Sequence, residues 1–419
     1  MTWGFIFSES LAALKFHRTR TIFTTTSLAW GVACFVILIS YGDGFKNALV
    51  KAFTAVGQDL IITFNGQTSS QAGGLRAGRK VRLELDDARI IKETVPLVDF
   101  LSPEIMKYGV KANNGHRDKD VAIRAVWPEY GIVRNIKLAT GRWINEDDRL
   151  HQARVVILGA KIYKDLFGES PAENQEMTLN GIRFTVIGVM ANKLQIANYN
   201  ESDNSCVFIP YDTFSIFGDI HYPWFLVWRP INGGVRDQAI KQVRERLADL
   251  HKFSPTDEKA IEILAFSKFM SIVDGMALAV QVLLGFVGSL TLAIGGVGLA
   301  NIMLASVIDR TKEIGMVKAL GARKSTILKQ FLVEATLVVA AGGALGITTG
   351  WVVTKLIGTM PFLGPAFQDT THVGDITLSV STTSILVSIT VLMVVGLVAG
   401  LVPAIKAARM DPIQALHYE

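Results

Sequence analysis

The sequence contains few of the residues that form metal sites, disulfides or catalytic centres. Its 419 residues include two cysteines, Cys34 within an apolar run and Cys206 within a polar region. A disulfide between them would have to join a membrane segment to a soluble domain, so we expect none. The seven histidines are scattered, without the paired spacing of a zinc site. We therefore predict that this chain binds no metal and no cofactor.

Signatures of catalysis are absent as well. No G-x-x-x-x-G-K-[ST] phosphate loop occurs, and GARKST at 321–326 lacks the first glycine at the required distance. The serine of GFVGSL does not lie between the two glycines, as a nucleophile elbow requires. Three neighbouring acids, Glu146, Asp147 and Asp148, are more typical of a solvated turn than of an acid/base pair. The chain is predicted not to be an enzyme and not to bind ATP itself.

The sequence is unusually rich in hydrophobic residues. Half of the residues are hydrophobic and 19% are charged, with a mean hydropathy of +0.34, which is too apolar for an ordinary soluble protein. The net charge is +5, and the basic residues cluster beside apolar runs. Membrane topology explains that pattern better than nucleic-acid binding does. We predict a protein of the lipid bilayer with no nucleic-acid partner.

Four uncharged runs predict four transmembrane α-helices, with a large α+β extracytoplasmic domain inserted between spans 1 and 2. The basic flanks place both termini in the cytoplasm. A continuous helix over the uncharged residues 275–308 would reach about 50 Å, so it either breaks at Gly295–Gly298 or projects beyond the bilayer as a stalk, and we favour the stalk. The predicted segments are an amphipathic helix on the cytoplasmic face (1–20), span 1 (21–42), the outer domain in two lobes (43–270), span 2 with its stalk (271–308), a cytoplasmic loop (309–334), span 3 (335–357), an outer loop (358–379), span 4 (380–405) and a cytoplasmic tail (406–419).

The outer domain carries clear turn signals. Asn113-Asn114-Gly115 predicts one β-hairpin within 108–126, and Asn180-Gly181 predicts a second between MTL and IRFTVIGVM. Helices are expected within LELDDARIIKETV and over 235–250. The alternation of strands and helices predicts an α+β domain.

The predicted spans contain no ionisable residue of the kind that an ion-coupled carrier needs at membrane depth. They do contain glycines at intervals of four, which favour close helix packing, although glycines can also be tolerated at random in a membrane helix. These packing glycines are Gly342, Gly346 and Gly350 in span 3, and Gly396 and Gly400 in span 4.

The loop at 309–334 is the most distinctive segment. It holds six Lys/Arg against three acids, and its apolar residues recur at roughly helical spacing. It is either a pair of short helices at the inner membrane face or an ordinary loop whose charges only fix topology.

Resemblance favours the first interpretation. RTKEIG (310–315) followed by KALGAR (318–323), together with TGRWINEDD, IRFTVIGVM and the final PAIKAARMDPIQAL, resembles the ABC-transporter permeases of the macrolide-exporter (MacB) and FtsX type. That resemblance implies a dimeric permease with two ATPase subunits on its cytoplasmic face. ATP hydrolysis there would move the outer domain without a conduit through the spans. The residues implied to contact the ATPase are Arg310, Thr311, Lys312, Glu313, Ile314, Gly315, Lys318, Gly321 and Arg323 in the loop, with Pro412, Ile413, Ala415 and Leu416 in the tail.

The same resemblance implies partners and a location. The chain is expected in the bacterial inner membrane with a second permease copy and a separate ATPase carrying ATP and Mg²⁺, because the sequence begins directly at the membrane segment. A periplasmic adaptor and an outer-membrane duct would complete an export system. Two other roles stay open: an FtsX-like signalling permease that controls a cell-wall hydrolase, and a lipoprotein-extracting permease.

Overall fold

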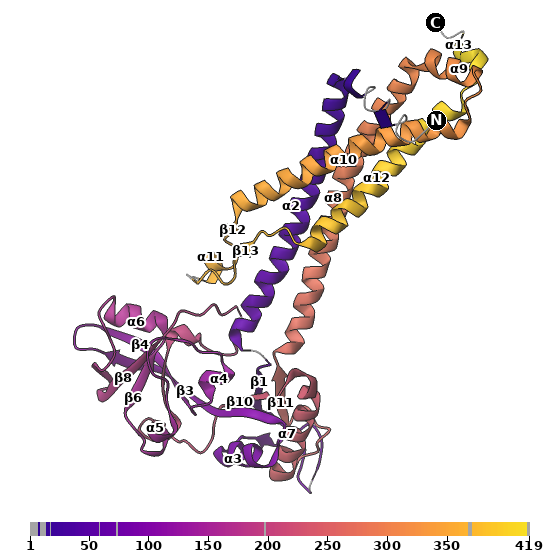
Figure 1. Ribbon diagram of the computed structural model, residues 1–419. Helices are drawn as coiled ribbons and strands as arrows, with labels where there is room; N and C mark the ends of the chain where they lie inside the picture. Colours follow the sequence, from indigo (N-terminus) through magenta and orange to yellow (C-terminus); the bar gives the residue numbers. More distant parts are fainter. Residues whose placement is uncertain are drawn as a thin grey trace. The chain divides into compact units, whose positions relative to one another are not determined.

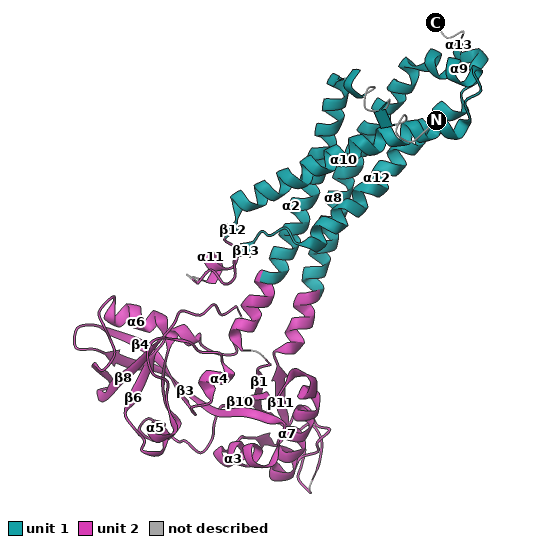
Figure 2. Ribbon diagram, in the orientation of Figure 1, with its two compact units in different colours: residues 1–47, 275–360, 376–419 teal, residues 48–274, 361–375 magenta. Residues whose placement is uncertain are grey.

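The computed structural model describes residues 7–8, 14–16, 18–57, 59–72, 74–196, 198–367 and 371–416. The chain divides into two compact units (Figure 2). The first, called the helical unit, comprises residues 1–47, 275–360 and 376–419; the second, called the sheet unit, comprises 48–274 and 361–375. Most of the predicted amphipathic helix at 1–20 lies outside the described residues.

The helical unit is built around four helices that are long and apolar enough to cross a membrane. They are α2 (Arg18–Val56), α8 (Ser267–Asp309), α10 (Lys324–Ile357) and α12 (Thr382–Arg409). Four short elements complete the unit. They are helix α9 (Thr311–Ala319), helix α13 (Pro412–Leu416) and the paired strands β12 (Thr359–Met360) and β13 (Ile376–Thr377). Helix α8 runs unbroken through Gly295–Gly298, as the favoured alternative expects.

Glycines set the spacing of these helices. A Cβ on Gly346 of α10 would lie 2.5 Å from the Cβ of Val32 in α2, and a Cβ on Gly396 of α12 would lie 2.6 Å from Val339 of α10. Both distances are shorter than any ordinary carbon contact. The backbones can approach this closely only because no side chain intervenes.

The sheet unit contains one connected sheet (Figure 1). The path of neighbouring strands is β11-β1-β10-β3-β4-β9-β6-β8-β5, with β2 beside β1, and β7 beside β3 and β8. The strand bounds are β1 Ile61–Gln67, β2 Lys80–Val81, β3 Val98–Asn113, β4 Asp118–Val126, β5 Leu138–Gly141, β6 Val155–Leu158, β7 Glu176–Leu179, β8 Ile182–Met190, β9 Cys206–Pro210, β10 Phe225–Pro230 and β11 Ile261–Ala265. Only β4–β9 and β6–β8 pair in parallel among these strands. The two predicted lobes are thus not separated by a break in the sheet.

Both predicted hairpins are confirmed. Strands β3 and β4 pair antiparallel around 114–117, and β7 and β8 pair antiparallel around Asn180-Gly181. In the second turn, Asn180 and Gly181 have φ of 49° and 82°. These are the left-handed values that a two-residue type I′ turn requires and that Asn-Gly adopts at low cost.

The core of the sheet unit lies on both faces of the sheet. Successive residues point to opposite faces; Ile61 belongs to one buried cluster and Ile62 to the other. Helices α3 and α7 contribute to the first cluster, while α4 and the end of α2 contribute to the second. The helical elements of the unit are α3 Leu85–Thr94, α4 Tyr130–Val133, α5 Glu146–Leu150, α6 Ala160–Phe167, α7 Arg236–His251, α11 Gly364–Phe367, η1 Asp203–Ser205, η2 Tyr211–Ile216 and η3 Gly233–Val235.

The unit boundaries differ from the predicted segments in two places. Helix α2 continues past residue 42 to Val56, whose side chain is fully buried in the second cluster. Residues 361–375, predicted as part of a connecting loop, belong to the sheet unit. The predicted bounds were placed at charged residues, which show only where a span is able to end. Both differences arise from apolar packing, which the positions of charged residues do not reveal.

Candidate coupling surface

Helix α9 and the residue after it have two distinct faces. Thr311, Ile314 and Gly315 are buried and Lys318 is half-buried, and their spacing of three or four residues places them along one side. We call this set the inward face. Lys312, Glu313 and Met316 are exposed on the other side, and Leu320, which follows the helix, is 84% exposed. We call these four residues the outward face.

The inward face holds the C-terminal helix α13. A Cβ on Gly315 would lie 2.7 Å from the Cβ of Ala415, so the two helices touch where the glycine leaves room. The Lys318 ammonium donates a 3.0 Å hydrogen bond to the Ala408 carbonyl and a further bond to the Met410 carbonyl. These carbonyls lie at the end of α12, where helical carbonyls have no partner of their own and a cation is favoured by the helix dipole.

Ion pairs fix the start of this segment. Arg310 lies 3.3 Å from Glu334 of α10, and this pair is 13% and 5% exposed. Asp309 at the end of α8 pairs with Arg20 of α2 at 2.8 Å. The Thr311 hydroxyl donates to the Ile308 carbonyl at 2.7 Å. The junction of α8 and α9 is therefore attached to two other long helices.

The residues predicted to contact an ATPase consequently divide into two groups. Five of them form internal contacts: Arg310, Thr311, Gly315, Lys318 and Ala415. Ile314 is also buried, and Pro412 is half-buried. Lys312, Glu313, Gly321, Arg323 and Ile413 are exposed. The side chain of Leu416 lies outside the described residues. Gly321 has a φ of +94° and forms the turn into α10, a conformation that only glycine adopts readily.

Sequence reasoning missed several contributors. Met316 and Leu320 are apolar yet 57% and 84% exposed, and neither is among the residues predicted to contact an ATPase. Glu334, which pairs with Arg310 at 3.3 Å, is not among the predicted residues either. The local sequence gives no signal that separates Met316 and Leu320 from the buried Ile314, because all three are apolar.

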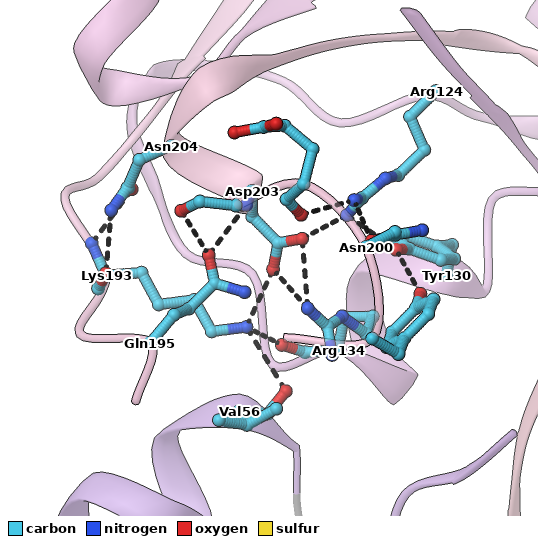
Figure 3. A network of polar contacts seen from close by, with 12 residues as sticks. Val56, Arg124, Tyr130, Arg134, Lys193, Gln195, Asn200, Asp203 and Asn204 are labelled. Atoms are coloured by element: carbon cyan, nitrogen blue, oxygen red, sulfur yellow. Dashed lines mark hydrogen bonds and ion pairs between the residues drawn. The ribbon is translucent and has the colours of Figure 1, made fainter. Parts of the chain in front are cut away.

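The sheet unit contains a second notable arrangement, a buried network of charges (Figure 3). Arg124 of β4 pairs with Glu104 at 3.1 Å and with Asp203, and Asp203 also pairs with Arg134 at 2.9 Å. Lys193 lies 3.2 Å from Asp203, and its ammonium donates to the carbonyls of Arg134 and Val56. Three cations thus face two carboxylates in the protein interior.

Val56 is the last residue of α2, so the network binds the end of that helix into the sheet unit. Burial alone would raise the pKa of Asp203, but Arg134, Lys193 and Arg124 together hold it well below its usual range. Burial lowers the pKa of Lys193 to about 8, although Asp203 acts in the opposite direction. Removing either partner would leave an uncompensated charge in the interior.

Apolar helices of spanning length and a large mixed-sheet unit are the features of a membrane protein that carries a folded domain of its own. Residues 21–249 match the MacB-like periplasmic core domain, and residues 285–412 match the FtsX-like permease C-terminal domain. The chain therefore belongs to the MacB/FtsX-type permease family of ABC transporters.

Two relatives in sequence agree with this assignment. The macrolide export ATP-binding/permease protein MacB of Wolinella succinogenes is 31% identical over 410 residues, which cover 97% of this chain and 60% of that protein. The MacB protein of Bdellovibrio bacteriovorus is 27% identical, covering 98% of this chain and 61% of that protein. The chain thus spans about 60% of the length of these relatives. The periplasmic region of MacB from Actinobacillus actinomycetemcomitans superposes with a TM-score of 0.41 at 21% identity, covering 52% of this chain and 94% of that structure.

Proposed function

We propose that this permease couples ATP hydrolysis by an ATPase to movement of its outer domain in an export system, with the outward face of α9 as the main coupling contact. The observation that carries the proposal is the division of α9. Its inward face contacts α13 and the end of α12, whereas Lys312, Glu313, Met316 and Leu320 are exposed and can meet another protein.

The chemistry of the outward face suits a protein partner. Met316 and Leu320 offer apolar surface that gains free energy when covered, at about 25 cal/mol per Å². Lys312 and Glu313 flank it with opposite charges that can fix the orientation of a partner. Ile413, which is 71% exposed on α13, is the candidate for a second contact from the tail.

The internal contacts explain how a push on this surface would reach the long helices. Arg310 is paired with Glu334 of α10, Asp309 with Arg20 of α2, and Lys318 is bound to the end of α12. A displacement of α9 must therefore move the ends of these helices or break these contacts, which include the mostly buried Arg310–Glu334 pair. Moving the helices as bodies costs less, which favours mechanical transmission.

Several finer features belong to the same proposal. The four long helices are four spans with both termini in the cytoplasm, and α8 extends beyond the bilayer. The ATPase is a separate subunit that carries ATP and Mg²⁺, and two permease copies assemble with it. A periplasmic adaptor and an outer-membrane duct complete the system. The basic residues of α9 and the following turn support the cytoplasmic placement. The names of the MacB relatives, macrolide export ATP-binding/permease proteins, support the use of ATP in export but describe both functions in one chain.

The experiment is a pull-down of tagged permease from the native membrane in mild detergent, with ATP hydrolysis measured on the eluate. The test variant is Met316→Asp with Leu320→Asp. The matched control is Leu150→Asp, at a residue that is 61% exposed in the sheet unit. We expect the wild type and the control to recover an ATPase and the double variant to lose it.

Two results would contradict the proposal. If the double variant recovers the ATPase at the wild-type level, the outward face is not the contact with the ATPase. A wild-type eluate without any ATPase would refute the proposed coupling of this permease to an ATPase. Identification of the other copurifying proteins separates the export role from a signalling role, because an adaptor and a cell-wall hydrolase are distinct proteins.

A further inference from the structure

A cavity of about 440 Å³ lies in the sheet unit beside the end of α2. Lys51, Thr54 and Ala55 of α2 form one wall, and their spacing of three and four residues places them on one helix face. The other walls come from α4 and the residues after it, from the segment after β8, and from Thr371 and Val373. This volume falls in the range of small-molecule sites, roughly 300–1,000 Å³.

The lining is strongly biased in charge. Four of the lining residues are basic, namely Lys51, Lys137, Lys193 and Arg229, and none of the described lining residues is Asp or Glu. Two of the four are already neutralised: Arg229 pairs with Asp99 at 3.0 Å, and Lys193 pairs with Asp203 at 3.2 Å. Lys51 and Lys137 are exposed, and within the described part of the chain no hydrogen bond or ion pair engages either ammonium.

The wall behind the cavity adds to this positive field. Lys193 belongs to the buried network in which three cations face two carboxylates (Figure 3). Arg134 of that network is 1% exposed, and its Nε and Nη1 atoms have no hydrogen-bond acceptor among the described residues. A surplus of buried positive charge is costly unless an anion lies nearby. Lys193 is the member of this network that lines the cavity, so an anion in the cavity would lie beside the network.

We propose that this cavity is an anion-binding site, in which Lys51 and Lys137 bind a phosphate or carboxylate group. Ala55, Ile132 and Leu194 provide apolar walls for a short hydrocarbon chain attached to that group. The ligand is therefore an anionic amphiphile or the free anion itself. The site is separate from the coupling surface and goes beyond the proposed export function.

The test uses the full-length permease in nanodiscs of zwitterionic lipid, titrated by calorimetry at low ionic strength, with empty nanodiscs as the reference. Hexyl phosphate, inorganic phosphate and hexanol are the probes. The test variant is Lys51→Gln with Lys137→Gln. The matched control is Lys80→Gln with Lys241→Gln, which removes the same charge from exposed positions of the sheet unit outside the cavity.

We expect saturable binding of hexyl phosphate, weakened ~10-fold or more in the test variant and unchanged in the control. Tighter binding of hexyl phosphate than of inorganic phosphate assigns the site to an amphiphile, and equal binding assigns it to a free anion. Equal weakening in the test and control variants would show a general charge effect and overturn the proposal. Absence of saturable binding of both phosphates to the wild type would overturn it as well, as would hexanol binding as tightly as hexyl phosphate.

Discussion

Replacing Asp203 by Asn removes the central carboxylate of the buried network without changing its size. Arg124, Arg134 and Lys193 would then face Glu104 alone, so a surplus of one positive charge becomes two. Asp203 is fully buried, and water cannot replace the lost charge. Breaking a buried ion pair from one side costs about 3–5 kcal/mol.

That cost converts into a temperature shift. For a domain of 150–250 residues, each kcal/mol lowers the midpoint of thermal unfolding by roughly 2–4 °C, so Asp203→Asn is expected to lower it by roughly 6–20 °C. The assay is hydrogen exchange of β4 and β9 during heating of the full chain in nanodiscs. Asp219→Asn is the control, because Asp219 is exposed and pairs only with exposed His221.

The same carboxylate predicts a pH dependence. The pKa of Asp203 in the folded protein lies below its usual range, so its contribution to stability is complete above the unfolded pKa of about 3.9 and is lost as pH falls through the folded pKa. The wild type and the Asn variant should converge in acid. A midpoint shift below about 2 °C at neutral pH, or one equal to that of Asp219→Asn, would refute the account of this network.

Four further predictions concern single positions. Gly346→Ala should destabilise the helical unit by about 1–3 kcal/mol in thermal unfolding, because its Cβ would lie 2.5 Å from Val32, whereas Gly285→Ala, whose Cβ would meet only Ile39 at 3.7 Å, should not. Lys318→Met should raise hydrogen exchange in α13, since the loss of charged hydrogen bonds costs about 1.5–3 kcal/mol each; Lys324→Met, at an exposed position, is the control, and equal exchange would argue against the docking of α13. Lys193 has its pKa lowered to about 8, so the unfolded chain binds more protons between pH 8 and about 10.4 and stability should rise across that interval; Lys193→Gln should abolish the rise, and its persistence would exclude Lys193 as the source. Glu313→Lys should leave exchange in the sheet unit unchanged while lowering permease-stimulated ATP hydrolysis ~10-fold, and undiminished hydrolysis would count against the outward face.

Local features of the fold could be predicted from the sequence. Asn180-Gly181 specifies its turn because both residues tolerate positive φ, and the Leu/Ile spacing of 85–94 specifies α3. The uncharged runs specify the four long helices because length and charge decide whether a helix can cross a bilayer. Each of these signals depends on residues close together in the chain.

The order of the strands could not be predicted, because pairing joins segments far apart, such as β4 with β9. The buried network has the same character: Arg124, Arg134, Lys193 and Asp203 come from four separate elements or loops. In the coupling loop, the basic residues were interpreted together as a contact surface. The structure shows that Arg310 and Lys318 are used internally, because each reaches an acceptor on another helix that the local sequence does not reveal.

The central claim is that the outward face of α9 contacts the ATPase, and site-specific photo-crosslinking tests it most directly. A photoreactive residue at position 316 should yield a crosslink to the ATPase in the native membrane, and one at position 150, which is exposed in the sheet unit, should yield none. The crosslink at 316 should change in intensity when ATP is added. Absence of a crosslink at 316, with the reagent active at other exposed positions of the helical unit, would contradict the account.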